Sequence, residues 1–295
     1  MIMLADKYHP GFTVRELLLQ AEKQLHASDS ARLDAELLLC SITGLERCVL
    51  YSCPELDIEP VQVAAFMAQV TERGAGIPVA YLTGVREFWS MPMQVNTHTL
   101  VPRPETEILV EAALQRIPSG SSLCIADLGT GCGAIALALA RERPACRFTA
   151  TDISNEALAV ARANAKQHLA DQISFVAGDW FSALTGTFDF IVSNPPYIRK
   201  DDEHFLDADI RHEPRLALCG GEDGMDALRY IITTAPRYLN AGGWLCIEHG
   251  CDQAPAVRDI FSDIGFAEVV TINDYAGLGR VTCGKCAHTK KQRQD

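Results

Sequence analysis

Apolar residues recur three or four positions apart up to about residue 75, as they do on one face of an amphipathic helix. Thr13 and Glu16 form a capping box at the start of the first such stretch. Gly44 is placed to end the second stretch, and Pro60 is placed to open the third. Helices are therefore predicted over residues 14–26, 29–43 and 60–74. Because this region carries no strand signal, it predicts a small helical bundle.

Beyond about residue 100, short apolar runs alternate with helical patterns. Strands are predicted over residues 123–127, 147–152, 173–177, 188–192, 244–248, 267–272 and 280–283. Helices are predicted over residues 104–116, 133–142, 154–167, 224–239 and 252–264. Such alternation is typical of a mostly parallel sheet with helices on both faces, so the predicted fold class is α/β with seven strands. The last two strands predict an antiparallel pair.

The pattern divides the chain into four parts. They are a helical domain, a connector, an α/β domain and a disordered tail, over residues 1–75, 76–100, 101–287 and 288–295. Within the connector, residues 85–89 and 93–96 predict a hairpin around Ser90, Met91 and Pro92. The helical domain is either a stabilising appendage or a module that docks a partner, and the pattern leaves both open.

Composition narrows the partners and the compartment. The net charge of −12 argues against a broad basic face for nucleic acid, although a local basic patch stays possible. Most of the 11 cysteines lie inside apolar runs, which predicts small buried side chains in a reducing compartment and no disulfide framework. The sequence shows no signal peptide and no apolar stretch long enough to cross a bilayer. We therefore expect a cytoplasmic protein that does not bind membranes or nucleic acid directly and is a monomer.

A glycine-rich run, Asp127 to Gly133, lies between the first predicted strand of the α/β domain and its helix. Glycines at this place permit a tight turn and a close approach of the backbone to a ligand. Because Ala134 completes the fingerprint Gly-x-Gly-x-x-Ala, the run suits either a nicotinamide dinucleotide or S-adenosylmethionine. The run alone does not decide between these two cofactors.

Acidic and aromatic residues follow the next two predicted strands. Asp152 ends the second strand, where a carboxylate can accept both hydroxyls of a ribose, or can simply be a favourable charge at the helix that Ser154 caps. Asp179 is a candidate acceptor for an adenine amino group. Trp180 either stacks beside the adenine ring or packs in the core.

Asn194, Pro195, Pro196 and Tyr197 follow the buried strand over residues 188–192. Two prolines cannot donate to a strand ladder, so the backbone leaves the sheet abruptly and places Asn194 in the ligand crevice of an open α/β sheet. The Asn194 side chain, two backbone carbonyls and the face of Tyr197 suit a planar amino or amide group. A proline-rich turn that merely ends a strand is the plain alternative.

This tetrapeptide favours methyl transfer over hydride transfer, because a dehydrogenase needs a residue that handles a proton on its substrate. An amide nitrogen is a poor nucleophile, since its lone pair is delocalised into the carbonyl. Hydrogen bonds from its two hydrogens to the side-chain oxygen of Asn194 and the carbonyl of Pro195 would orient it and enrich it in electrons. Placing nitrogen and methyl carbon about 3–3.5 Å apart would supply much of the rate. No metal and no general base are assigned.

Over about residues 10–285 the chain resembles the release factor glutamine methyltransferases, a HemK-like family with the class I, Rossmann-like methyltransferase fold. The segments that carry the resemblance are residues 86–89, 102–107, 127–133, Asp152, 178–180, 194–197 and 213–215. Residues 194–197 are shared with many amino-methyltransferases, whereas residues 102–107 after a helical domain are much more specific. The resemblance implies methylation of the glutamine in the Gly-Gly-Gln motif of peptide chain release factors, with S-adenosyl-L-methionine as cofactor.

The resemblance also implies the site residues. The cofactor site is expected to contain Gly129, Thr130, Gly131, Cys132, Gly133, Asp152, Trp180 and Asn194. Asn194, Pro195, Pro196 and Tyr197 are expected to grip the glutamine, with Asn194, Pro195 and Tyr197 as catalytic residues. Residues 1–75 are expected to help dock the release factor. A small side chain such as that of Cys132 is compatible with the glycine-rich run.

Three other interpretations stay open. An amino-methyltransferase that acts on adenine or guanine in DNA or RNA would use the same tetrapeptide on a flipped base. A non-catalytic cofactor-binding module and a dehydrogenase are the remaining candidates. Cys283, Cys286 and His288 lie close together in the sequence, but structural metal sites usually need a fourth ligand, so no metal is predicted.

Overall fold

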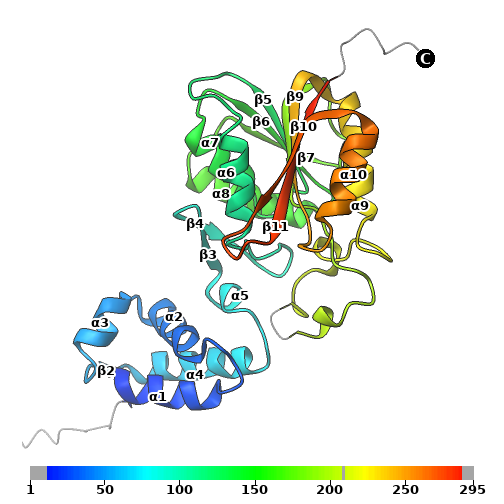
Figure 1. Cartoon of the computed structure of the whole chain (residues 1–295). Helices are drawn as coiled ribbons and strands as arrows, with labels where there is room; N and C mark the ends of the chain where they lie inside the picture. Colours follow the sequence, from blue (N-terminus) through cyan, green and yellow to red (C-terminus); the bar gives the residue numbers. More distant parts are fainter. Residues whose placement is uncertain (1–11, 208–209, 288–295) are drawn as a thin grey trace, which may run out of the picture. The chain divides into compact units, whose positions relative to one another are not determined.

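The computed structural model describes residues 12–207 and 210–287 (Figure 1). The chain divides into two compact units, Met1–Gly84 and Val85–Asp295. The predicted tail, residues 288–295, lies outside the described residues. No helix within the described ranges is both long and apolar enough to span a membrane.

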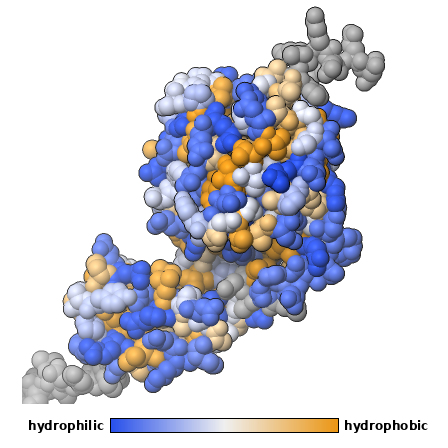
Figure 2. Space-filling view, viewed as in Figure 1, coloured by the Kyte–Doolittle hydropathy of each residue, from blue (hydrophilic) through white to orange (hydrophobic). Residues whose placement is uncertain are grey.

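The first unit contains five helices among its described residues. They are α1 (Val14–Gln24), α2 (Ala31–Thr43), α3 (Arg47–Ser52), α4 (Pro60–Gly74) and α5 (Val79–Thr83). Their apolar faces meet in one core around Leu17, Leu38 and Phe66, which are fully buried. The three predicted helices are confirmed, together with the capping box of Thr13 and Glu16. Figure 2 shows that apolar side chains also appear among the polar ones on the surface of this unit.

The expectation that this region has no strands is wrong. Two-residue strands β1 (Phe12–Thr13) and β2 (Asp57–Ile58) pair in an antiparallel arrangement at the start of α1. A two-residue strand is too short to show an alternating pattern, so sequence periodicity cannot reveal it. The short helices α3 and α5 escaped prediction for the same reason.

The second unit opens with a hairpin of β3 (Val85–Phe88) and β4 (Met91–Gln94). Its turn consists of Trp89 and Ser90, both with φ of 52°. Residues other than glycine rarely adopt this backbone conformation. The predicted turn around Ser90, Met91 and Pro92 was therefore displaced by about two residues. A side-chain carboxylate holds this turn, since the Trp89 N–H donates to Glu107 at 2.7 Å.

Seven strands form the main sheet, in the order β10-β11-β9-β8-β5-β6-β7. They are β5 (Cys124–Leu128), β6 (Arg147–Asp152), β7 (Ile173–Ala177), β8 (Phe188–Ser193), β9 (Leu239–Glu248), β10 (Phe266–Asn273) and β11 (Gly279–Cys286). Strands β5 to β9 are parallel, and β11 lies antiparallel between β9 and β10. The predicted α/β fold class and the antiparallel last pair are confirmed.

Helices cover both faces of this sheet (Figure 1). They are α6 (Thr106–Leu114), α7 (Ala134–Glu142), α8 (Asn155–Gln167), α9 (Asp226–Thr234) and α10 (Ala254–Ile264). The predicted helix over residues 224–239 is too long, because α9 passes into a short 3-10 turn, Ala235–Arg237, and β9 begins at Leu239. Pro236 explains this end, since proline cannot continue the hydrogen bonding of a helix.

Candidate active site

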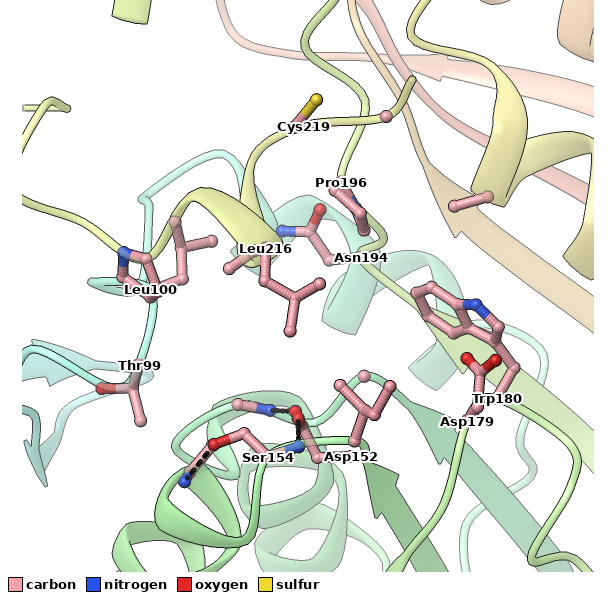
Figure 3. A pocket seen from close by; sticks show the side chains of 18 of the residues that line it. Thr99, Leu100, Asp152, Ser154, Asp179, Trp180, Asn194, Pro196, Leu216 and Cys219 are labelled. Carbon is pink, nitrogen blue, oxygen red and sulfur yellow. Dashed lines mark hydrogen bonds between the residues drawn. The ribbon is translucent and has the colours of Figure 1, made fainter. Parts of the chain in front are cut away.

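A cavity of about 700 Å³ opens at the carboxyl ends of the parallel strands β5 to β8. Figure 3 shows Asn194 and Pro196 on one side of it, Asp152 and Ser154 on the opposite side, and Trp180 with Asp179 at one end. Open α/β sheets place their ligands at this edge, where the strand order reverses. Cavities of this size hold cofactors and drug-sized ligands.

The glycine-rich run forms the wall that follows β5. Gly129 and Gly131 line the cavity with φ of 70° and 56°. Asp152 braces this wall, because its carboxylate accepts the Gly131 N–H at 2.8 Å and the Ser154 N–H at 2.9 Å. One carboxylate oxygen is thus paired with each backbone N–H, and each oxygen keeps a further lone pair for a ligand hydroxyl.

Three residues predicted to contact the cofactor lie behind this wall. Thr130 donates its hydroxyl to the buried Asp127 carboxylate at 2.6 Å. Cys132 is buried, and its carbonyl accepts the Asn164 side-chain N–H at 2.9 Å. Gly133 is the N-cap residue of α7 and has a φ of 87°. None of the three lines the cavity, so they shape the run from within.

Trp180 packs directly against the glycine-rich run. A Cβ atom at Gly129 would stand 3.1 Å from the Trp180 ring, so only glycine lets the indole approach this closely. The carbonyl of Trp180 accepts the Thr151 hydroxyl at 3.1 Å, which fixes the residue at its unusual φ of 48°. Asp179 lines the same end of the cavity. The indole therefore both packs on the core and faces the cavity.

Asn194 leaves β8 with its side chain in the cavity. Its Nδ2 donates to the Thr106 hydroxyl at 3.0 Å, which leaves its Oδ1 as an acceptor, and the residue lines the cavity (Figure 3). Thr106 is the first residue of α6 and is itself buried. The sequence predicted the position of Asn194 but gave no sign of this partner.

The other members of the tetrapeptide separate. Asn194 and Pro196 line both the large cavity and a neighbouring cavity of about 130 Å³, whereas Pro195 and Tyr197 line only the smaller one. The Tyr197 hydroxyl donates to Glu248 at 3.2 Å, and burial raises the pKa of the phenol. The ring that the sequence places over an amide plane is thus anchored in the protein interior and faces the smaller cavity only.

A buried glutamate that the sequence did not assign joins the two segments around these cavities. Glu213 accepts the Val101 N–H at 3.0 Å and forms a short ion pair with Arg103. This contact joins the segment that precedes α6 to the segment that carries Leu216 in the cavity wall. The motif segments 102–107 and 213–215 are therefore one structural feature, which pattern reasoning cannot show across so long a separation.

Two buried carboxyl groups flank the site. Burial raises the pKa of Asp127 to about 7, and burial also raises the pKa of Glu248 to about 7. Burial raises the pKa of the Cys132 thiol to about 12, so this thiol is neutral and unreactive at neutral pH. The described residues contain no group of three or more His, Cys, Asp or Glu side chains that could hold a metal ion.

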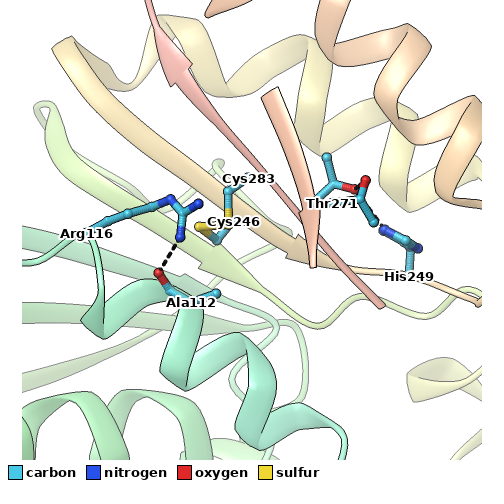
Figure 4. Close-up of a disulfide and its surroundings, with 7 residues drawn as sticks. Ala112, Arg116, Cys246, His249, Thr271 and Cys283 are labelled. Atoms are coloured by element: carbon cyan, nitrogen blue, oxygen red, sulfur yellow. Dashed lines mark hydrogen bonds between the residues drawn. A yellow bond between two sulfur atoms is a disulfide. The ribbon is translucent and has the colours of Figure 1, made fainter. Parts of the chain in front are cut away.

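One cysteine pair corrects the expectation that the cysteines do not form disulfides. Cys246 of β9 and Cys283 of β11 are direct cross-strand partners, and their sulfurs are bonded (Figure 4). Sequence separation gave no hint of this pair, because the register of antiparallel strands was not predicted. The bond also removes Cys283 from any candidate metal site. Cys146 is buried as expected, whereas Cys40 and Cys124 are only partly buried.

Comparison with known proteins places this geometry in a family. Residues 104–212 match the methyltransferase small domain, and residues 16–84 match the PrmC N-terminal domain. A release factor glutamine methyltransferase of Salmonella typhimurium is 48% identical over 91% of this chain and 97% of its own length. Its counterpart in Escherichia coli K12 is 47% identical over 91% of this chain and 97% of its own length. A methyltransferase structure from Pyrococcus furiosus shares the fold, with a TM-score of 0.51, 21% identity, and coverage of 66% of this chain and 88% of that chain.

The fold, the cavity and these matches show the class of enzyme. The chain is a methyltransferase with a Rossmann-like sheet, and its methyl donor is S-adenosyl-L-methionine. The full-length relatives then define the group within that class. The chain belongs to the release factor glutamine methyltransferase family.

Proposed function

We propose that this protein methylates the side-chain amide nitrogen of the glutamine in the Gly-Gly-Gln motif of a peptide chain release factor. Membership of the family supports this substrate. The observation that carries the proposal is the Asn194 side chain, whose Nδ2 is held by Thr106, so that its Oδ1 is left to accept from a ligand, and which borders both cavities. A fixed amide oxygen at this place accepts an N–H bond from a planar carboxamide.

The large cavity fits the methyl donor. Its size suits S-adenosyl-L-methionine, and the Gly129 turn leaves room that a Cβ atom would close. We assign ribose binding to Asp152, the adenine end to Asp179 and Trp180, and close backbone approach to Gly129 and Gly131. When bound, the donor supplies an electrophilic methyl group.

Asn194 and Pro195 then act on the glutamine. Asn194 Oδ1 and the Pro195 carbonyl accept one N–H each, which orients the nitrogen toward the methyl group and raises its electron density. The neighbouring cavity of about 130 Å³, which Asn194 and Pro195 line, offers room for the glutamine side chain. Tyr197, anchored by Glu248, forms a rigid wall of that cavity. The positive charge of the product is relieved by loss of one N–H proton to water.

Mass spectrometry of a co-incubated release factor tests this function. We expect one added methyl group on the motif glutamine, and no addition when that glutamine is replaced by alanine. Nucleic acid offered with the same isotope-labelled donor should stay unlabelled. Label in DNA or RNA and none in the factor would replace the proposal with a base amino-methyltransferase.

We further propose that the helical unit docks the release factor. It exposes large apolar side chains, among them Tyr51 at 60% and Val61 at 77% exposure, which a partner surface could cover. Val61→Asp should raise the KM for the factor and leave donor affinity unchanged. Leu169→Asp, at an equally exposed position of the other unit, is the matched control. Equal KM values for both variants would make the helical unit a structural element only.

The remaining expectations complete the proposal. The acidic chain acts as a monomer on a protein substrate, without direct contact to nucleic acid or membrane. We place the reaction in the cytoplasm, because release factors work during protein synthesis. Sedimentation of the purified protein at several concentrations checks the monomer, since a dimer would sediment faster as the concentration rises.

A further inference from the structure

The roles proposed for Asn194 and Pro195 provide partners for the NH2 half of the glutamine carboxamide only. Its carbonyl oxygen enters the same site, and an amide oxygen that loses water without gaining a donor costs free energy. Most side chains around the smaller cavity cannot supply that donor, because they are apolar, Leu100, Ile198 and Leu218 among them. The carbonyl oxygen therefore needs one of the few polar side chains in this wall.

Three residues of the wall carry N–H or O–H groups on their side chains, namely Arg103, Asn194 and Tyr197. The Nδ2 group of Asn194 donates to Thr106 at 3.0 Å, and Tyr197 donates its one hydroxyl hydrogen to Glu248 at 3.2 Å. Arg103 has donors to spare, because a guanidinium carries five N–H groups. It lines the smaller cavity and not the large one, so it is placed for the glutamine and not for the methyl donor.

A buried carboxylate holds the Arg103 guanidinium at this wall. Its Nη2 pairs with Glu213, whose side chain is fully buried, whereas the side chain of Arg103 is 32% exposed. The Val101 N–H fixes the other oxygen of Glu213 at 3.0 Å. Within residues 12–207 and 210–287, Glu213 is the one side-chain partner of this guanidinium, so its Nε and Nη1 groups can donate to a ligand.

We propose that Arg103 donates to the carbonyl oxygen of the substrate glutamine and thereby selects a neutral carboxamide. The proposal rests on the function proposed above. With Asn194 and Pro195 accepting from the NH2 group, every polar atom of the carboxamide then has a partner. A side chain without the oxygen leaves N–H groups of the site unpaired, which such sites reject strongly. Glu213 balances the charge of Arg103, so a carboxylate gains little from the cation and meets two acceptor oxygens instead.

The chemistry of the amide assigns Arg103 to binding and not to rate. Resonance places part of the nitrogen lone pair on the carbonyl oxygen, and a cation beside that oxygen stabilises the resting amide. During transfer the lone pair enters the new N–CH3 bond while the S–CH3 bond breaks, so the oxygen becomes less negative. The contact with Arg103 does not strengthen in the transition state. Its loss should therefore raise the KM for the factor without lowering kcat.

A double-mutant cycle between enzyme and factor tests the contact. Arg103→Met removes the guanidinium, and a release factor whose motif glutamine is replaced by alanine lacks the carboxamide. With S-adenosylhomocysteine bound, Arg103→Met should weaken binding of the unchanged factor roughly 10- to 100-fold, the range for a hydrogen bond to a charged group. It should leave binding of the alanine factor unchanged. Arg280→Met is the control, because Arg280 is also a partly buried arginine paired with one aspartate, Asp274, and lines neither cavity.

Equal weakening for both factors would overturn the contact, because it would trace the loss to disorder around the unpaired Glu213 carboxylate. A loss of donor affinity in Arg103→Met, or a lower kcat at an unchanged KM, would overturn it as well. Failure of the proposed function looks different, since the wild-type enzyme would then leave the motif glutamine unmethylated.

The charge balance of the pair gives a second, independent readout. Glu213→Gln leaves the charge of Arg103 uncompensated, so the enzyme should tolerate a carboxylate better. We expect the ratio of affinities for the unchanged factor and for a factor with glutamate in the motif to shift several-fold toward the glutamate factor. Asp274→Asn makes the same change beside Arg280 and should leave this ratio unchanged. An unchanged ratio in Glu213→Gln would overturn the selection of a neutral side chain by this pair.

Discussion

The two sides of the large cavity are built in different ways. On the glycine side, backbone groups face the ligand, and neighbouring strands hold them: the Thr130 N–H donates to the Thr151 carbonyl at 2.9 Å, and the Gly131 N–H donates to Asp152. On the asparagine side, one side chain faces the ligand, and its partner Thr106 lies 88 residues away in the sequence. The first side depends on the absence of side-chain atoms and the second on their identity.

This difference teaches where each kind of mutation should act. A Cβ atom added on the glycine side should obstruct binding of the methyl donor. Loss of a hydrogen-bonding side chain on the asparagine side should lower kcat without lowering the affinity for the donor. Donor affinity and kcat can therefore be measured separately. Each of the following variants is expected to change mainly one of the two.

Asn194→Ala should have the largest effect. Removing a preorganised group that acts on the reacting atoms typically costs roughly 100- to 1,000-fold in kcat, and we expect a loss in this range with only a small change in donor affinity. Steady-state kinetics with release factor, together with calorimetric titration of the donor, measures both. Asn273→Ala, at an exposed position of β10, is the control and should behave like the wild type. A parallel collapse of donor binding would erase the distinction between the two sides.

Gly129→Ala should act mainly on donor binding. The added Cβ would stand 3.1 Å from the Trp180 ring, at a φ of 70° that alanine tolerates poorly. We expect the dissociation constant to rise about tenfold, which corresponds to about 1.4 kcal/mol. Gly120→Ala carries the same backbone cost at φ of 75° but meets nothing within 4 Å, so it isolates the contact from the strain. Equal donor affinity in the two variants would show that close approach at Gly129 is unimportant.

Glu213→Gln should have a smaller effect, on the asparagine side of the cavity. A charged hydrogen bond of this kind contributes roughly 1.5–3 kcal/mol when it is buried, but glutamine keeps one acceptor for the Val101 N–H, so part of the contact survives. We expect the KM for release factor to rise a few-fold while donor affinity is kept. Glu268→Gln removes the exposed ion pair with Lys285 and should leave both constants alone. A change confined to donor affinity would show that Glu213 acts on the glycine side of the cavity instead.

The sequence predicted one side of the cavity far better than the other. The glycine run, Asp152 and Trp180 each follow a strand directly, and parallel strands bring such positions to one edge by topology alone. Even here the sequence could not tell Gly129 and Gly131, which face the cavity, from Thr130, which lies behind it. A turn exposes only some of its residues, and local pattern does not reveal which.

Contacts between distant segments account for what the sequence missed. The Asn194–Thr106 and Tyr197–Glu248 hydrogen bonds and the Glu213 contact need three-dimensional neighbours, and a single sequence contains no record of them. The same holds for the Cys246–Cys283 bond, which follows from the register of β9 and β11. Tyr197 illustrates the limit most clearly, because an aromatic residue beside a site can face the ligand, the core or both.

Asp127→Asn should have the smallest effect, and it concerns the support of the glycine side. Burial raises the pKa of Asp127 to about 7, whereas an unfolded aspartate titrates near about 3.9. Between these values the folded chain keeps a proton that the unfolded chain releases, so this group's contribution to the free energy of unfolding falls as pH rises and levels off above about 7. Asparagine cannot titrate. From pH 6.5 to 7.5 the wild type should therefore lose somewhat less than about 1 kcal/mol relative to the variant. Chemical unfolding at the two pH values measures this difference, and the contributions of all other titrating groups cancel in it.

Glu248→Gln is the control, because it retains the slope that Asp127 causes. Parallel unfolding curves for Asp127→Asn and wild type would mean that Asp127 is already ionised in the folded protein, and that the Thr130 hydroxyl braces the glycine run against a full negative charge.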